Sequence, residues 1–342
     1  MRSRSILIIS LKPLIPVRSG MQNTIYLLYK YLKIKKFNIF FLEVKTNNSI
    51  DPILNLNYKK NIEIKIKKKI KLLKPNLIFV NTSKLLFLYN DILINKKKNF
   101  KTILISHDLY FFRKKYFSSI NIKDKTPLSY QREISTLKKV NHIIDISEEE
   151  KKYLLKNKIS KRKIIHTFTP TKKFQKINFT TKKKYDILYI SGKWKQNKFN
   201  ILNTLKMLKL EKNNLKLLIV GSLPLFLKNS KNIFKKKYNQ RNLRTAKLGI
   251  ALIKKGSGRN TKIFEMLALG LPILTNINLK DYKLKNLHHY FLINNMTKIN
   301  QSLKTLLADI NLRKKLSRNA YNWSKKHSYF KIAFRGLNKI LY

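Results

Sequence analysis

The stretch "KKGSGRNTKIFEMLALGLPILTN", residues 254–276, combines two residue types that are scarce elsewhere in the chain. Glycine occurs only 8 times in 342 residues, yet Gly256, Gly258 and Gly270 all lie here. Glu265 is one of 16 acidic residues, against 76 Lys and Arg. A glycine that persists in a glycine-poor sequence indicates a backbone position with φ > 0 or a close approach.

The order of residues in this stretch predicts a strand, a glycine loop and a helix in succession. An apolar run over 248–254 predicts the strand, and a helix follows over 260–269 until Gly270 and Pro272 end it. The 256–258 loop would present free N–H groups at the positive end of that helix. Such a turn is typical of an anion-binding site.

Charged side chains around the predicted loop suit this interpretation. Arg259 and Lys262 supply cations, and Glu265 follows Lys262 by three residues, so both side chains can point to one side of the helix. The alternative is an ordinary turn in which Gly270 caps the helix and Glu265 pairs with Lys262 on a solvated face. A Gly-x-Gly loop alone is weak support for a binding site.

Short apolar runs alternate with longer helical segments along most of the chain, which is typical of βαβ units and parallel sheets. The predicted strands are 5–10, 37–44, 76–82, 101–107 and 142–147, then 185–191, 215–222, 248–254 and 272–276. From Met296 onward the pattern is helical. We therefore predict an α/β chain with a doubly wound domain over 1–170, a linker over 171–184, a second such domain over 185–325, and a C-terminal helix over 326–342 that packs toward the first domain.

The formal net charge of +60 admits two interpretations. A strongly basic chain is typical of proteins that bind nucleic acid or anionic membranes. However, lysine is abundant everywhere together with asparagine and isoleucine, which favours a bias in the coding DNA acting on surface positions. The sequence has no helix-turn-helix, RRM or zinc pattern, so we expect no nucleic-acid partner.

Other features of the composition exclude several kinds of chemistry. The chain has no cysteine, which excludes disulfides and thiolate chemistry. Its apolar runs are far shorter than the ~20 residues of a transmembrane helix, and we interpret the apolar start as a first strand rather than a leader. Five of the six histidines have no metal-ligand spacing with carboxylates, so we expect a structural role for them and no metal or cofactor. They are His142, His166, His288, His289 and His327.

The segment from Gly256 to Asn276 resembles the nucleotide-sugar signature of retaining GT-B glycosyltransferases of the family 4, or group 1, type. The similarity extends over nearly the whole chain, through "SILIISLKPLIPVRSGMQNTIYLLYKYL" (5–32), "ISHDLY" (105–110), "YDILYISGKWKQNKFN" (185–200) and "LLIVGS" (217–222). It implies a GT-B fold, in which two Rossmann-like domains face a cleft and the last helix crosses back to the first domain. It also implies retaining transfer of a sugar from a UDP- or GDP-linked donor to a glycan or lipid-linked acceptor, as in cell-surface polysaccharide or lipopolysaccharide synthesis.

The resemblance also implies roles for individual residues. His107 matches a histidine near the transferred sugar, and Glu265 matches the glutamate that holds the donor ribose hydroxyls, so both are candidate catalytic residues. Lys262 matches a basic residue near the donor diphosphate, which the loop around Gly20 approaches. The donor-binding candidates are Gly20, Lys193, Gly256, Ser257, Gly258, Arg259, Lys262 and Glu265.

Two departures from the family pattern leave alternatives open. Ser257 stands where many members carry a glutamate that contacts the sugar, so the identity of the sugar is open. "TFTPTKKF" (167–174) replaces the Asn-Gly-Val-type turn expected there. The alternatives are a catalytically impaired GT-B scaffold and a basic nucleic-acid-binding protein.

Two further segments admit a structural interpretation. Ser147 with Glu150 three residues on fits a capping box at the start of a helix. "IEIKIKKKIKLLK" (62–74) is either an ordinary surface helix or an interfacial helix that contacts anionic lipid. The expected location is the cytoplasm, with peripheral contact at the inner face of the plasma membrane.

Overall fold

The computed structural model describes most of the chain and divides it into two compact units. The described residues are 4–17, 19–44, 56–94, 99–107, 109, 129–145, 147–179, 182–192, 195–221, 230–253 and 260–342. The first unit contains the described residues up to Pro170 together with Ala333–Tyr342. The second contains the described residues between Thr171 and Ile332.

The first unit is built on a six-stranded sheet in the order β2-β1-β3-β4-β5-β6, and all of its pairings are parallel. Its strands are β1 (Ser5–Ser10), β2 (Asn38–Glu43), β3 (Leu77–Asn81), β4 (Lys101–Ile105), β5 (His142–Asp145) and β6 (Ile164–His166). Its helices are α1 (Gly20–Ile34), α2 (Leu56–Leu73), α3 (Ser83–Leu88), α4 (Asn90–Leu93), α6 (Tyr130–Lys139), α7 (Glu148–Lys156) and the 3-10 turn η1 (Lys161–Lys163).

The apolar strand residues of this sheet are buried on both faces. Neighbouring residues of a strand point to opposite faces, and Ile6, Leu7, Ile8 and Ile9 of β1 are all fully buried. Leu7 and Ile9 belong to the same apolar cluster as residues of α2, α3 and α6. A parallel sheet covered on both faces explains why its strands are continuous apolar runs rather than alternating ones.

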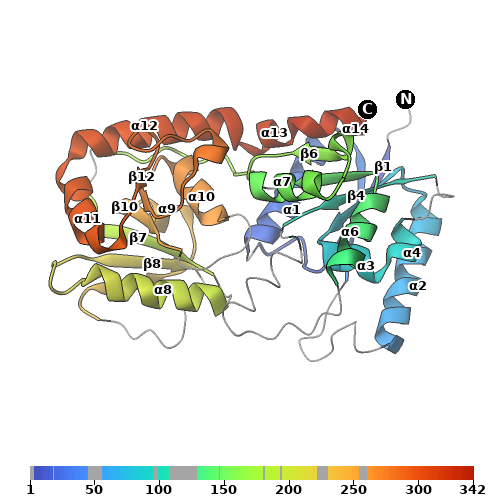
Figure 1. Ribbon diagram of the computed structural model, residues 1–342, viewed down its shortest axis with the longest axis horizontal. Coiled ribbons are helices and arrows are strands. Elements are labelled where there is room, and N and C mark those ends of the chain that lie inside the picture. The colour runs from blue at the N-terminus through green and yellow to red at the C-terminus, as the bar shows by residue number, and fades with distance from the viewer. Residues whose placement is uncertain are drawn as a thin grey trace. The chain divides into compact units, whose positions relative to one another are not determined.

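The second unit is again a sheet with helices packed around it (Figure 1). The sheet is all-parallel, in the order β12-β11-β10-β7-β8-β9. Its strands are β7 (Tyr185–Ser191), β8 (Leu217–Gly221), β9 (Ile233–Lys236), β10 (Ala246–Ala251), β11 (Ile273–Thr275) and β12 (Phe291–Leu292). Its helical elements are α8 (Lys195–Leu208), α9 (Gln240–Leu243), α10 (Thr261–Leu269), η2 (Lys280–Tyr282), η3 (Met296–Lys298), α11 (Ile299–Ala308), α12 (Ile310–His327) and the start of α13 (Phe330–Ala333). Counted within the unit, this is the strand order of the Rossmann fold.

The final residues of the chain belong to the first unit. They form the 3-10 turn η4 (Phe334–Leu337) and the short helix α14 (Asn338–Leu341). The Tyr31 hydroxyl of α1 donates to Asn338 Oδ1 at 2.7 Å, and the Arg4 guanidinium donates to the Leu341 carbonyl at 3.0 Å. Phe334 packs against Tyr31, with 5.7 Å between the ring centroids.

The prediction of two doubly wound parallel sheets is confirmed, and each predicted strand is present: β1 and β7 have the predicted bounds, β10 is shifted toward the N-terminus, and the others are slightly shorter. Three short strands, β6, β9 and β12, were not predicted. Gly270 ends α10 in the left-handed region with φ 67°, as its position in the sequence predicts. Among the described helices, none has the length and apolar character needed to cross a bilayer.

Replacing Phe334 should destabilise the first unit although the residue comes near the end of the chain. Phe334 is 1% exposed, so Phe334→Ala should lower the free energy of unfolding of this unit by about 3–5 kcal/mol. The measurement is urea unfolding followed by signals from each unit. Phe199→Ala is the matched control because Phe199 is 43% exposed. Equal losses for both variants would contradict the packing described here.

Candidate functional site

The second unit has a polar cluster where the order of its strands reverses. That reversal lies between β7 and β10, and in open α/β sheets ligands bind beyond the carboxyl ends of strands at such a point. Helix α8 follows β7 and helix α10 follows β10, so their first turns lie at this edge. Asn197 comes from α8, whereas Lys262 and Glu265 come from α10.

Glycines allow α10 to lie close to the sheet. A Cβ atom at Gly249 of β10 would lie 2.2 Å from Met266 Sδ, so the Met266 side chain of α10 could not keep its present position against any larger residue there. At the other end of the helix, Gly270 turns the chain into β11 with the positive φ that a left-handed cap requires. These contacts fix the helix that carries Lys262 and Glu265.

Lys262 is held by two groups from neighbouring elements. Its Nζ donates to Asn197 Oδ1 at 2.6 Å and lies 5.2 Å from the centroid of the Tyr189 ring, a cation–π distance. Burial lowers the pKa of Lys262 to about 8, and the nearby Glu265 carboxylate opposes that shift. A lysine in this state is poorly solvated and gains from an anionic ligand.

Glu265 is a partly buried carboxylate on the same helix. Burial raises its pKa to about 7, while a hydrogen bond from Tyr238 and the charges of Lys172 and Lys262 act in the opposite direction. Tyr238 follows β9, and burial together with Glu265 raises the pKa of its phenol. A carboxylate with a raised pKa benefits from ligand hydroxyls that donate to it.

Together these side chains offer a cation and a hydrogen-bond acceptor about one helical turn apart. Sequence reasoning identified Lys262 and Glu265 but missed Asn197, Tyr189 and Tyr238. Asn197 and Tyr238 lie 65 and 27 residues away from their partners along the chain, so no local spacing relates them. Lys193, Gly256, Ser257, Gly258 and Arg259 lie outside the described residues.

Gly20 lies at the first position of α1 in the first unit, in a loop held by side chains. Ser19 caps the helix by accepting from the Gln22 N–H at 3.2 Å. The Gln22 side-chain amide then donates to the Pro13 carbonyl at 3.1 Å and the Pro16 carbonyl at 3.2 Å. The loop between β1 and α1 is therefore tied to the helix that follows it.

His107 lies just beyond the carboxyl end of β4 and is partly buried. Its neighbour Ser106 continues the sheet, because the Ser106 N–H donates to the Ile144 carbonyl at 3.0 Å. His107 and Gly20 thus both lie at the carboxyl edge of the first sheet, whose strand order reverses between β1 and β3, and β4, which precedes His107, is the strand next to β3.

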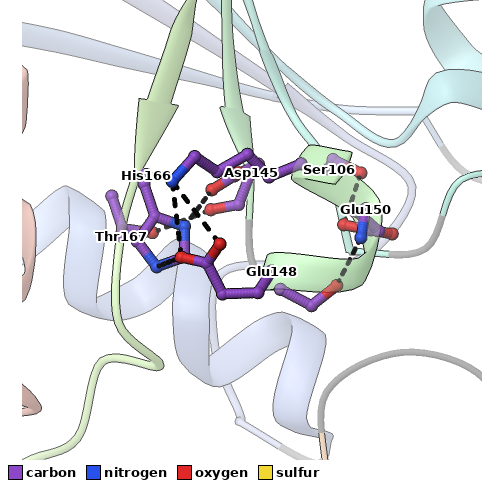
Figure 2. Close-up of polar contacts among 8 residues, drawn as sticks. Ser106, Asp145, Glu148, Glu150, His166 and Thr167 are labelled. Atoms are coloured by element: carbon purple, nitrogen blue, oxygen red, sulfur yellow. Dashed lines mark hydrogen bonds and ion pairs between the residues drawn. The ribbon is translucent and has the colours of Figure 1, made fainter. Parts of the chain in front are cut away.

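A second polar cluster at this edge was not predicted (Figure 2). His166 Nδ1 lies 2.7 Å from the buried Asp145 Oδ1, and His166 Nε2 lies 3.3 Å from Glu148 Oε1. Both ring nitrogens face carboxylate oxygens, so the pairing links the ends of β5 and β6 to the first turn of α7. Within the described part of the chain, no group of three such side chains could hold a metal ion.

Comparison with known proteins shows the fold. No protein-family profile and no curated protein sequence matches the chain. Among solved structures, sucrose-phosphate synthase from Thermosynechococcus elongatus is similar with a TM-score of 0.78, 13% identity and 98% of each chain covered. A glycosyltransferase from Rickettsia africae gives 0.66 at 17% identity, covering 100% of this chain and 98% of that one. HepE from Anabaena gives 0.67 at 10% identity, with 98% of each chain covered. The chain therefore has the GT-B fold of two Rossmann-like domains.

Proposed function

We propose that the chain is a glycosyltransferase that transfers a sugar from a nucleotide-activated donor, with retention of the anomeric configuration. The observation that carries this proposal is the Lys262–Glu265 pair at the strand-order reversal of a Rossmann-like sheet, within a GT-B fold. A cation and a carboxylate one helical turn apart match the two polar parts of a nucleoside diphosphate. Lys262 would face its phosphates, and Glu265 would accept hydrogen bonds from its ribose hydroxyls.

The chemistry of such a transfer suits the residues of this chain. The nucleoside diphosphate leaves as the sugar carbon becomes electron-poor, so cations and helix-end amides that stabilise the leaving group contribute most. The described part of the cluster offers Lys262 and the first turn of α10 for that purpose. By the sequence resemblance, His107 would act on the transferred sugar and the Gly20 loop on the donor diphosphate.

Solved structures with this fold suggest which ligands to test first. HepE has been determined with UDP-glucose, and one structure of TarM contains UDP and a glycosylated glycerol. WaaB is a lipopolysaccharide galactosyltransferase. For this chain we therefore place UDP before GDP as the donor nucleotide, and a glycan or a lipid-linked saccharide as the acceptor.

An acceptor anchored in a membrane would require contact with lipid, and α2 has the surface for it. Ile64 and Leu72 are 61% and 69% exposed on this helix, while Ile62 and Ile66 are buried. The exposed apolar side chains are surrounded by exposed lysines: Lys60, Lys65, Lys67, Lys68, Lys69, Lys71 and Lys74. Apolar groups within a basic helix face suit the interface of an anionic bilayer, and this supports the proposal that the enzyme works in contact with the inner face of the plasma membrane.

Removing the charge of Glu265 should weaken nucleotide binding. Glu265→Gln should reduce the affinity for UDP by about 1.5–3 kcal/mol, the usual contribution of hydrogen bonds to a charged group. The measurement is calorimetry at fixed salt, with Glu211→Gln as the control because Glu211 is exposed in the same unit. Lys262→Ala should weaken binding more at low salt than at high salt, since its partner is a phosphate. Unchanged affinity in Glu265→Gln, with clear binding by the wild type, would refute the site.

Nucleotide affinity should also pass through a maximum with pH. Below about pH 7 Glu265 is protonated and loses acceptor capacity, and above about pH 8 Lys262 loses its charge. UDP should therefore bind best between these values. In Glu265→Gln the decrease on the acid side should become smaller, while the decrease on the alkaline side stays. If the affinity for UDP decreases equally in both proteins at acid pH, the group that titrates is on the nucleotide and not Glu265.

Neutralising the exposed face of α2 should reduce binding to anionic vesicles. Replacing Lys65, Lys68 and Lys69 by Gln should lower the affinity for phosphatidylserine-containing vesicles by about 1 kcal/mol per lysine. The measurement is co-sedimentation with vesicles with and without phosphatidylserine. Replacement of the exposed Lys314, Lys315 and Lys326 of α12 by Gln changes the net charge equally and should have less effect. Equal losses would indicate general charge attraction rather than a docking helix.

A further inference from the structure

Three consecutive glutamates begin α7, and Figure 2 shows that two of them, Glu148 and Glu150, point toward different partners. Glu148 reaches His166 of β6, and Glu149 is exposed. Glu150 points the other way and is only 3% exposed. A buried carboxylate is costly unless it is fully hydrogen-bonded, so its partners indicate what the residue is for.

The partners of Glu150 lie on both sides of His107. Leu109 N–H donates to Glu150 Oε1 at 2.8 Å, and Ser106 Oγ donates to Glu150 Oε2 at 3.3 Å. Ser106 and Leu109 are themselves fully buried. One carboxylate therefore ties the residue before His107 and the second residue after it to the same rigid helix.

Glu150 is itself fixed in place by the start of α7. Its N–H donates to Ser147 Oγ at 3.1 Å, the helix cap that the sequence predicts. A negative charge in the first turn is stabilised by the helix dipole, and hydrogen bonds to a carboxylate are stronger than neutral ones. Glu150 is therefore held by the helix cap on one side and by its hydrogen bonds to Ser106 and Leu109 on the other.

From this geometry we infer that Glu150 is the positioning residue that sets where the His107 imidazole meets the transferred sugar. The inference rests on the proposed function, because it takes His107 to be part of the transfer site. Glu150 is too buried to touch substrate, and it acts through the backbone of the loop between Ser106 and Leu109. A displacement of about 1 Å in a reacting group can slow a reaction about 100-fold, so a loop that carries such a group needs an anchor of this kind.

A double-mutant cycle on turnover tests the inference. The probe is release of UDP or GDP from a panel of nucleotide sugars, with water as the acceptor. Glu150→Ala should lower kcat about 10- to 100-fold and change the KM for the donor less than about 2-fold. In the His107→Ala background, the same change should lower kcat less than about 2-fold further, because the anchor then has nothing to position.

Control variants separate positioning from loss of the fold. Glu149→Ala removes the same charge from the same helical turn and should leave kcat unchanged, since Glu149 is exposed. Glu150→Gln keeps an oxygen that can accept from Leu109 and should recover part of the lost kcat. Ser106→Ala removes one hydrogen bond without leaving a buried charge unpaired, so it should fold and show a smaller decrease in kcat.

A readout without turnover completes the test. Hydrogen exchange of the Leu109 amide should become at least about 10-fold faster in Glu150→Ala and stay unchanged in Glu149→Ala. Losses of kcat that multiply in the double variant, or unchanged exchange at Leu109, would overturn the inference while leaving the proposed function intact. A wild type that releases no nucleotide from any donor would instead count against the proposed function, and the inference would fail with it.

Discussion

Parallel pairing in both described sheets is the constraint on which the arrangement of polar groups depends. A parallel strand can be reached only by crossing over the sheet, usually through a helix, so the carboxyl ends of all the strands meet at one edge. In the second unit this brings the first turns of α8 and α10 together. In the first unit it brings His107, Asp145 and His166 to the ends of three adjacent strands, although Asp145 and His166 are 38 and 59 residues from His107 along the chain. In both units, residues that are far apart in the sequence come close together only because the strands that carry them are parallel.

The Lys262–Glu265 pair shows how burial alters the protonation of two oppositely charged groups on one helix. Both side chains have lost part of their solvation, which moves the pKa of each toward the other. The hydrogen bond from Tyr238 and the charges of Lys172 and Lys262 offset the raised pKa of Glu265 only in part. A molecule with phosphates at one end and hydroxyl donors at the other would satisfy both groups at once.

The fold was predictable because its signals are local. Apolar runs such as 6–9 and 77–80 identify buried strands, and Ser147 and Gly270 identify helix ends by their own chemistry. The three missed strands have two to four residues, and β9 contains two lysines, so their apolar signal is too weak to separate them from loops. For such strands, pairing in the sheet decides the conformation rather than side-chain pattern.

Only part of the candidate site could be predicted, because its other contacts join residues that are far apart in the sequence. Lys262 and Glu265 are one helical turn apart, and spacing reveals them. The contacts of Glu150 with Ser106 and Leu109 span more than 40 residues, and the glutamate run around it suggested only a helix cap. The Asp145–His166 pair spans 21 residues and depends on the register of β5 against β6, which composition does not encode.

The C-terminal segment has a consequence for how the protein is made. Phe334, Leu337 and Leu341 are buried in the first unit, and Arg4 binds the last carbonyls of the chain. On the ribosome, these residues are translated only after the whole second unit has been synthesised. The first unit, although it begins to emerge earlier, cannot complete its core until then, whereas the second has all of its own residues sooner. Synthesis therefore delivers all residues of the second unit before it delivers the last residues of the first.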